Sequence, residues 1–277
     1  MPRAVARISS ARTVSLATAL GVVIAGAGAP LCAETPARAL RASAPIVLDG
    51  RLDEADWQKA PVASGFRQRD PDQGQPATES TELRLLFDDH ALYVGARLRD
   101  GEPTKIVRQL SRRDALAEGD TFTLYLDPHR DRRTGVVLQV SAAGVQRDAA
   151  IYDDNFEDDT WDAVWESAVG IDGDGWSVEM RVPFSQLRFP TAPGHTWGVN
   201  ARRVVHRKNE SSWLVLVPKN ESGLASRMTG LEGIDGIDPG RHLELLPYVS
   251  GRAELIEPTR DVDPWNDGSR LYGGAGL

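Results

Sequence analysis

Apolar and polar residues alternate with a period of two in many short segments of the chain. The segments are separated by turn-like stretches rich in Asp, Gly and Pro, and they are residues 82–87, 91–98, 121–127, 135–141, 176–182, 196–205 and 212–217. Such alternation is typical of strands with one buried face. Because the strands are short and no long helix intervenes, the pattern predicts an all-β fold, an antiparallel β-sandwich.

Helical patterning is confined to two places. Residues 53–60 have an acidic first turn, and residues 183–187 begin with Pro. These features predict one short helix and one single turn. Between two of the strands, residues 127–135 (DPHRDRRTG) are predicted to form a charged turn.

The first 33 residues have the order of a secretory signal peptide. Three arginines occur in the first twelve residues, an apolar run follows, and Leu31 and Ala33 occupy the −3 and −1 positions of a cleavage site. The single cysteine, Cys32, lies inside this segment, so the remaining chain has no disulfide framework. The sequence therefore predicts export to the periplasm or outer membrane, with residues 34–44 as a linker to a sandwich at 45–225.

Alternation of another kind occupies the C-terminal part, residues 226–277. Residues 241–257 alternate for about fourteen positions, and the apolar side chains Leu243, Leu245, Val249, Ala253 and Leu255 share one face. This length suits a transmembrane barrel strand. Either the segment packs on the sandwich, or it follows a linker and begins a C-terminal β-barrel of a longer protein. We favour the second interpretation.

Composition and charge exclude several classes of function. The 277 residues are 41% hydrophobic and 26% charged, which is normal for a globular domain. The formal net charge of −8 argues against nucleic acid as a partner, because phosphate binding requires a basic surface. The sequence contains no G-x-S-x-G or H-E-x-x-H motif, and no Gly-rich phosphate loop.

Six segments in order resemble the family 9 carbohydrate-binding modules. They are IVLDGRLDEADWQKA (46–60), LYVGARLRD (92–100), EGDTFTLYLDPHRDRRTG (118–135), DDTWDAVWES (158–167), GWSVEMRVPFSQLRF (175–189) and WGVNARRV (197–204). The resemblance covers roughly residues 44–220. It implies a jelly-roll-like β-sandwich with one or two short helices and sugar binding, with bound calcium in some members. The founding members accompany glycoside hydrolases, whose catalysis belongs to a separate domain.

Two further motifs make the resemblance more particular. LRF follows the Pro turn, and LELLPYV follows the sandwich. This form is similar to the periplasmic module that precedes an uncharacterised outer-membrane β-barrel family. The resemblance implies a barrel in the same longer protein as a partner.

Two tryptophans four residues apart are the leading candidates for sugar stacking, because pyranose faces pack on aromatic rings. Trp161 follows an acidic run on a predicted loop and is the stronger candidate, whereas Trp165 enters the next strand. The other tryptophans in strands or the helix fit core positions, namely Trp57, Trp176, Trp197 and Trp213.

Three polar residues complete the predicted carbohydrate site. Arg113 precedes a strand, and its guanidinium has five fixed donors suited to sugar hydroxyls. Asn200 and Arg202 alternate on one strand and therefore share a face. The alternative for this face is ion pairing with the acidic run.

The acidic run itself has three interpretations. Calcium prefers six to eight oxygen ligands from one flexible loop, and the run supplies carboxylates and an amide. Arginine pairing or plain solvation would equally relieve the repulsion among its charges. The candidate metal ligands are Asp153, Asp154, Asn155, Glu157, Asp158 and Asp159, and the candidate arginines are Arg112, Arg113, Arg147, Arg202 and Arg203.

The sequence thus supports three hypotheses. The first is non-catalytic binding of an oligo- or polysaccharide by an exported sandwich. The second is a structural or docking domain of an outer-membrane barrel protein, without sugar binding. The third is glycoside hydrolysis, which requires two carboxylates flanking the scissile bond; the turn-like surroundings of the acids argue against the raised pKa that one of them needs.

Overall fold

A computed structural model of the protein describes residues 36–115, 117–192, 194–238, 248–255 and 270–276. The predicted signal peptide and residues 241–247 and 256–257 of the C-terminal alternating segment lie outside the described residues. The described part of the chain contains no helix with the length and hydropathy needed to cross a membrane.

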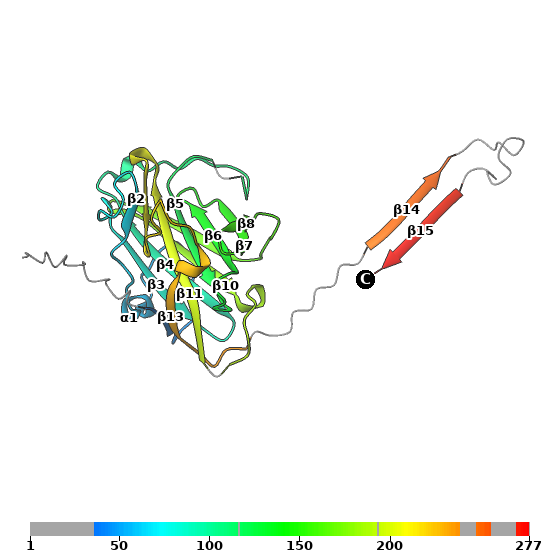
Figure 1. The fold of residues 1–277 in the computed structure, drawn as a ribbon, viewed down its shortest axis with the longest axis horizontal. Coiled ribbons are helices and arrows are strands. Elements are labelled where there is room, and N and C mark those ends of the chain that lie inside the picture. The colour runs from blue at the N-terminus through cyan, green and yellow to red at the C-terminus, as the bar shows by residue number, and fades with distance from the viewer. Residues whose placement is uncertain (1–35, 116, 193, 239–247, 256–269, 277) are drawn as a thin grey trace, which may run out of the picture. The chain divides into compact units, whose positions relative to one another are not determined.

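Thirteen strands form one continuous sheet that curls into two layers (Figure 1). One layer has the order β8-β7-β6-β5-β11-β13, with β12 and β2 continuing beside β11, and the other has the order β1-β3-β4-β10-β9. This arrangement confirms the predicted β-sandwich. The strands are β1 (Ala37–Arg41), β2 (Arg67–Asp70), β3 (Thr81–Phe87), β4 (Ala91–Arg99), β5 (Thr121–Asp127), β6 (Gly135–Ser141), β7 (Gln146–Tyr152), β8 (Phe156–Asp158), β9 (Glu166–Asp172), β10 (Gly175–Pro183), β11 (Gly194–Val205), β12 (Glu210–Trp213) and β13 (Thr229–Asp235).

Helices are short, as the sequence predicts. The predicted helix is α1, and the predicted single turn is η2; the described helical elements of the sandwich are α1 (Ala55–Lys59), η1 (Pro103–Lys105), η2 (Phe184–Gln186), η3 (His206–Lys208) and η4 (Ala225–Arg227). The charged turn predicted at 127–135 is also present, as the connection between β5 and β6.

The strand β1 differs from the linker predicted for residues 34–44. It pairs in parallel with β13 on one side and with β3 on the other, so it joins the two layers, while the other strand pairs are antiparallel. Its buried residues Ala37 and Ala39 alternate with exposed or half-buried ones, but five residues rich in Ala and Arg are too short a pattern to separate from a linker. The sandwich also extends past residue 225, because β13 belongs to it.

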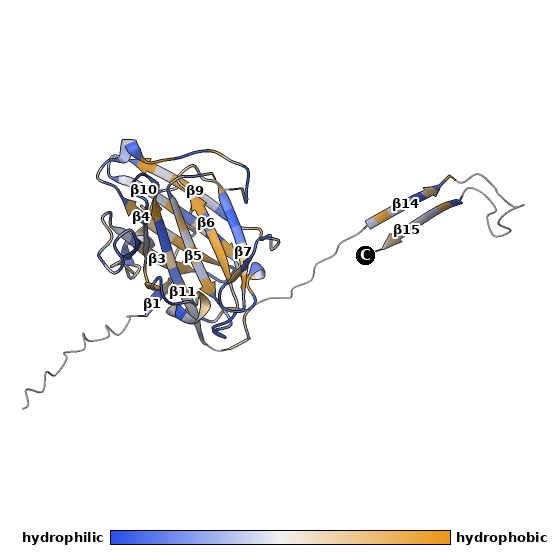
Figure 2. Cartoon of the chain, turned by 45° about the horizontal axis from the view of Figure 1, so that its top comes forward, coloured by the Kyte–Doolittle hydropathy of each residue, from blue (hydrophilic) through white to orange (hydrophobic). Residues whose placement is uncertain are grey.

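Apolar side chains from both layers fill the space between them. Figure 2 shows hydrophobic residues running along β6 and hydrophilic residues in many of the connecting loops. Trp176 and Trp197 lie in this core, as predicted, and Trp197 contacts Phe184 and Phe189 edge-on or tilted. Every residue of β5 is buried, because its second face is covered as well: there Tyr125 stacks on Trp213 at 5.2 Å between ring centroids.

The outer face of β4 and β10 is covered by the segment that contains α1. Trp57 is fully buried there, and Gly95 of β4 leaves room for it, since a Cβ at this position would lie 2.9 Å from the indole ring. The indole Nε1 of Trp57 donates to the buried carboxylate of Glu179 at 3.1 Å. The amides of Asp49 and Gly50 donate to the same carboxylate at 3.0 and 2.8 Å, so Glu179 fixes the segment on the sheet.

Residues 248–255 and 270–276 form a separate two-stranded hairpin, of β14 (Tyr248–Glu254) and β15 (Arg270–Gly276). Side chains of directly opposed residues point to the same face of an antiparallel pair. In this register Val249 faces Ala275 and Ala253 faces Leu271, whereas Glu254 faces Arg270. One face of the hairpin is therefore apolar and the other is mainly polar.

Candidate functional site

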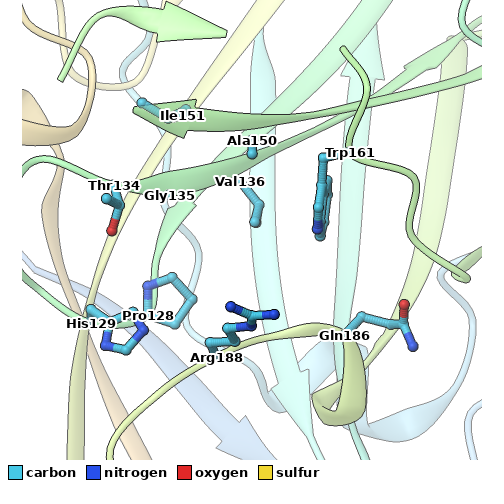
Figure 3. Close-up of a pocket in the computed structure, with 10 residues that line it drawn as sticks. All are labelled: Pro128, His129, Thr134, Gly135, Val136, Ala150, Ile151, Trp161, Gln186 and Arg188. Atoms are coloured by element: carbon cyan, nitrogen blue, oxygen red, sulfur yellow. The ribbon is translucent and has the colours of Figure 1, made fainter. Parts of the chain in front are cut away.

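Trp161 lies on the connection between β8 and β9 and lines a pocket of about 390 Å³. The side chain is partly buried and packs against the core. Figure 3 shows the indole on one side of the pocket and Pro128, His129 and Thr134 on the opposite side. The sequence predicted an exposed loop position, and the structure places Trp161 at the edge between core and solvent.

Apolar groups and a few polar side chains share the lining of this pocket. Strand residues supply much of the apolar part, and Pro128 of the β5–β6 connection adds to it; the strand residues are Gly135, Val136, Ala150 and Ile151. The polar side chains are those of His129, Thr134, Gln186 and Arg188. An aromatic wall, an apolar lining and convergent polar groups are the usual features of a small-molecule site.

Gln186 and Thr134 are oriented by bonds to their surroundings. The Oε1 atom of Gln186 accepts from the amide of Val164 at 3.0 Å, and its Nε2 donates to the hydroxyl of Ser185 at 3.5 Å. The hydroxyl of Thr134 donates to Asp131 at 2.7 Å, so its lone pairs are left as acceptors. The second N–H of Gln186 is left as a donor, and the hydroxyl of Thr134 is left as an acceptor.

Arg113 supports the loop that carries Trp161 and does not line the pocket. Its guanidinium donates to the carbonyl of Ala163 at 2.7 Å, to Asp148 at 2.8 Å and to Gln146 at 3.0 Å. Asp148 in turn accepts from the amide of Ala163 at 2.5 Å, and burial raises the pKa of Asp148 despite these donors. The predicted ligand role of Arg113 is thus replaced by a positioning role.

Arg113→Ala is expected to accelerate amide hydrogen exchange in residues 159–165 and to lower the free energy of unfolding by about 1–2 kcal/mol. The reason is that Ala163 loses one hydrogen bond and Asp148 keeps its burial without a cation. Exchange mass spectrometry and urea denaturation measure both effects. An exchange pattern identical to that of the parent chain would contradict the positioning role.

Asn200 and Arg202 share a strand face, as predicted, but that face is covered by the segment after β12. Asn200 is buried and pairs with the backbone of Val215, donating to its carbonyl and accepting from its amide, both at 2.9 Å. The guanidinium of Arg202 lies 5.5 Å from the ring centroid of Trp213. Neither residue lines the Trp161 pocket, so the structure does not support their predicted role there.

Trp165 is a core residue. Only 4% of its surface is exposed, and it belongs to the hydrophobic cluster between the layers. Of the two tryptophans predicted as stacking partners, the structure brings only Trp161 to the pocket.

The acidic run forms a hairpin turn between β7 and β8. Asp153 and Asp154 have positive φ angles of 45° and 69°, a conformation that Asp and Asn adopt more readily than most residues. Asp154 accepts from the amide and the hydroxyl of Ser226 at 2.7 and 2.6 Å, and Asn155 accepts from the amide of Gly223 at 2.6 Å. Turn geometry and docking on the 223–226 segment therefore account for these residues.

The remaining acids of the run have arginine or local partners. Arg133 pairs with Asp153 at 2.8 Å, and Arg147 contacts both Glu157 and Asp159, at 2.7 and 2.5 Å. Asp158 accepts from the amide and hydroxyl of Thr160. In the described part of the chain, no group of three or more His, Cys, Asp or Glu side chains is placed to hold a metal ion. Arginines pair with three of the six predicted ligands, Asp153, Glu157 and Asp159, while the other three bond to backbone amides or hydroxyl groups; calcium binding by the run stays a prediction.

A second aromatic feature was not predicted from the sequence. Tyr152 and Phe156 face each other across the β7–β8 hairpin, and their rings stack with centroids 5.5 Å apart. They are 48% and 57% exposed. Aromatic residues on either side of a turn rich in Asp are the sequence signal that points to such a pair.

Comparisons with solved structures support the fold. Two structures of a family 9 carbohydrate-binding module from Caldicellulosiruptor kristjanssonii, one with cellotriose and one with glucose, are each 17% identical to this chain. The cellotriose complex has a TM-score of 0.52 and aligns over 70% of this chain and 92% of its own; the glucose complex has 0.50, 75% and 98%. A protein from Bacteroides uniformis is 10% identical, with a TM-score of 0.55 over 74% of this chain and 98% of its own.

The family follows from a match over more than half of the sequence. A model of the carbohydrate family 9 binding domain-like family matches residues 48–210. The chain therefore belongs to that family, and the predicted resemblance to family 9 modules is confirmed. A search of curated protein sequences finds no match.

Proposed function

We propose that this chain binds carbohydrate, without catalysis, in the pocket lined by Trp161. The observation that carries the proposal is the position of this indole, which forms one side of the pocket (Figure 3). The rest of the lining contains both apolar and polar residues. Membership of the family and the sugar complexes of two structures with this fold support it.

The physical argument rests on what a pyranose ring requires. Its C–H faces pack on an aromatic ring, and its hydroxyls need donors and acceptors at the edge of the ring. Trp161 supplies the face, while Gln186 and Thr134 supply an amide donor and a hydroxyl acceptor. A volume of about 390 Å³ lies within the usual range for small-ligand sites.

The lining of the pocket argues for binding without hydrolysis. A glycosidase places two carboxyl groups on either side of the scissile bond. Of the ten described residues that line this pocket, none is Asp or Glu. We therefore place any glycoside hydrolysis in an associated domain.

Isothermal titration of the chain from Glu34 onward with glucose, cellotriose and xylotriose tests the proposal. We expect heat of binding that Trp161→Ala reduces about tenfold or more in affinity. Tyr152→Ala, at the exposed aromatic pair, is the matched control and leaves the affinity unchanged. Loss of binding in Tyr152→Ala alone would move the site to the β7–β8 hairpin. Repeating the titration with EDTA tests calcium, which we expect to be dispensable because the acidic run has other partners.

A second candidate function is docking to an outer-membrane barrel, and the hairpin β14–β15 favours it. Val249 and Leu271 are 90% and 85% exposed, on the face that the strand register makes apolar. Strands of membrane barrels have one apolar face in the same way. We propose an exported protein whose C-terminal part enters the outer membrane. Fractionation of cells that express the intact gene is the test, and recovery in the soluble periplasmic fraction would count against it.

A further inference from the structure

The chain has a negative net charge, but the described residues that line the Trp161 pocket include an arginine and no acid. The formal net charge of the chain is −8, yet none of the ten described lining residues is acidic. The pocket instead contains one arginine, Arg188, and one histidine, His129. Both lie on connections, Arg188 just after η2 and His129 between β5 and β6.

Arg188 is an exposed side chain that lacks a carboxylate partner among the described residues, unlike several arginines near this site. Arg113, Arg133 and Arg147 each form ion pairs with carboxylates at 2.8 Å or less. Arg188 makes no hydrogen bond or ion pair with any described residue. In Figure 3 its guanidinium group lies between Pro128 and Trp161, inside the group of lining side chains.

Several acids lie close in sequence to the pocket residues. Asp127, next to Pro128, is buried; its Oδ2 accepts from the amide of Arg132 at 2.9 Å, and its Oδ1 has no hydrogen-bond partner among the described residues. Asp131 accepts from the amides of Arg133 and Thr134 at 2.8 Å and from the Thr134 hydroxyl. Asp153 pairs with Arg133. None of these acids pairs with the exposed guanidinium of Arg188, which is therefore free to bind an anionic group of a ligand.

From this arrangement we infer that the sugar bound in the pocket carries a carboxylate, that is, it is a uronic acid. The inference rests on the proposed function. With the pyranose face on Trp161, the carboxylate at C6 receives two parallel N–H donors from the guanidinium of Arg188, whose planar fork matches carboxylate geometry. Gln186 donates to a ring hydroxyl. A neutral glucan or xylan satisfies Trp161 and Gln186 but leaves Arg188 without its partner.

Two pairs of ligands, each an acid and the methyl ester that removes its charge, test the inference by isothermal titration. They are trigalacturonic acid with its trimethyl ester, and an aldotetraouronic acid of glucuronoxylan with its methyl ester. We expect each acid to bind about tenfold more tightly than its ester, since hydrogen bonds to charged groups are stronger than neutral ones. The difference is expected to shrink in 0.5 M NaCl, because salt screens exposed charges.

Two variants test whether Arg188 causes the preference for the acid over the ester. Arg188→Gln keeps a long polar side chain and is expected to equalise acid and ester, with little change in ester affinity. Arg38→Gln removes the same charge from an exposed position on β1, which does not line the pocket, and is expected to leave the preference intact. A sulfated galactose oligosaccharide of matched length separates carboxylate recognition from general anion binding.

The outcomes distinguish the two proposals. Equal binding of acid and ester in both pairs, with loss of both in Trp161→Ala, would overturn the uronic-acid inference and leave sugar binding standing. Tighter binding of the sulfated ligand than of either acid would overturn the carboxylate assignment. A preference for the acids that persists in Arg188→Gln would overturn the role of Arg188. Absence of binding by every ligand would remove the proposed function and this inference together.

Discussion

Trp165→Ala is expected to lower the free energy of unfolding by about 3–5 kcal/mol, the usual cost of truncating a buried tryptophan. Trp161→Ala is expected to cost much less, because Trp161 is only partly buried. The two residues lie four positions apart in one acidic, aromatic stretch, yet Trp165 is 4% exposed and Trp161 lines a pocket. The sequence favoured Trp161 over Trp165 as the stacking residue, and the structure places Trp165 in the core and Trp161 at the pocket.

Urea denaturation followed by circular dichroism measures the free energy of unfolding of both variants. Titration with sugar measures their affinities, for which we expect the reverse order of effects. Trp165→Ala is expected to retain affinity under conditions in which it is folded, whereas Trp161→Ala loses it. Trp165→Phe serves as a matched control that retains most of the buried ring and is expected to recover most of the stability. A large loss of stability in Trp161→Ala, together with a small one in Trp165→Ala, would contradict the assignment of core and site.

The second large effect concerns the dependence of stability on pH. Burial raises the pKa of Glu179 to about 7 from 4.5, and the nearby charge of Glu54 acts in the same direction. The hydrogen bonds from Gly50, Asp49 and Trp57 oppose this shift but are outweighed. The folded state therefore holds a proton on Glu179 that the unfolded state releases between about pH 4.5 and pH 7.

This difference in bound protons determines whether stability rises or falls with pH. Stability falls as pH rises wherever the folded state binds more protons than the unfolded state. At about 1.4 kcal/mol for each pKa unit, Glu179 alone reduces the free energy of unfolding by up to about 3 kcal/mol between pH 4.5 and pH 7. Below pH 4.5 its contribution is constant, because the carboxyl is protonated in both states.

Comparison with Glu179→Gln isolates this contribution, since other carboxyl groups titrate equally in both proteins. The stability difference between the parent chain and Glu179→Gln is expected to decrease with rising pH across that window and to level off above it. Trp57→Phe, which removes one donor to the carboxylate, is expected to extend the window to higher pH. A difference that is independent of pH would show that Glu179 has the same pKa in both states.

The parts of the fold that the sequence predicted are those with a strong local signal. Strands such as β4 and β10 have long alternating or apolar segments, and α1 has its acidic first turn. Six strands of the sandwich were not predicted, β1, β2, β7, β8, β9 and β13, and three of them illustrate why. β9 is an edge strand with no fully buried residue, β8 has three residues, and β1 gains its place from parallel pairing with two distant strands.

Strands β12 and β5 show what an alternating pattern does not predict, namely where a strand ends and which of its faces is covered. Residues 212–217 alternate, yet the strand ends at Trp213 because the following segment turns to cover the second face of β5. That coverage buries Asn200 against Val215 and places Arg202 over Trp213. Alternation correctly put the two polar residues on one face, but it contains no information on which face solvent reaches.

Of the residues that line the candidate site, the sequence predicted only Trp161. Trp161 was identified because an aromatic residue after a polar turn has few reasons to be buried. Its partners come from segments distant in sequence, with His129 and Thr134 on one connection and Gln186 and Arg188 near η2. The spacing of these pocket residues along the chain does not reveal that they are close, because the packing of β6 and β7 brings them together.

Titration of the ¹⁵N-labelled chain with cellotriose and trigalacturonic acid, monitored at the tryptophan indole N–H signals, tests the central claim most directly. The seven tryptophans give separate reporters, and Trp161→Phe assigns the one that matters. Saturable binding that shifts the Trp161 indole most, with backbone shifts at Thr134 and Gln186, is the predicted result. Saturable binding that leaves Trp161 and these amides unchanged, or no shift with any sugar from the folded chain, would contradict a carbohydrate site in this pocket.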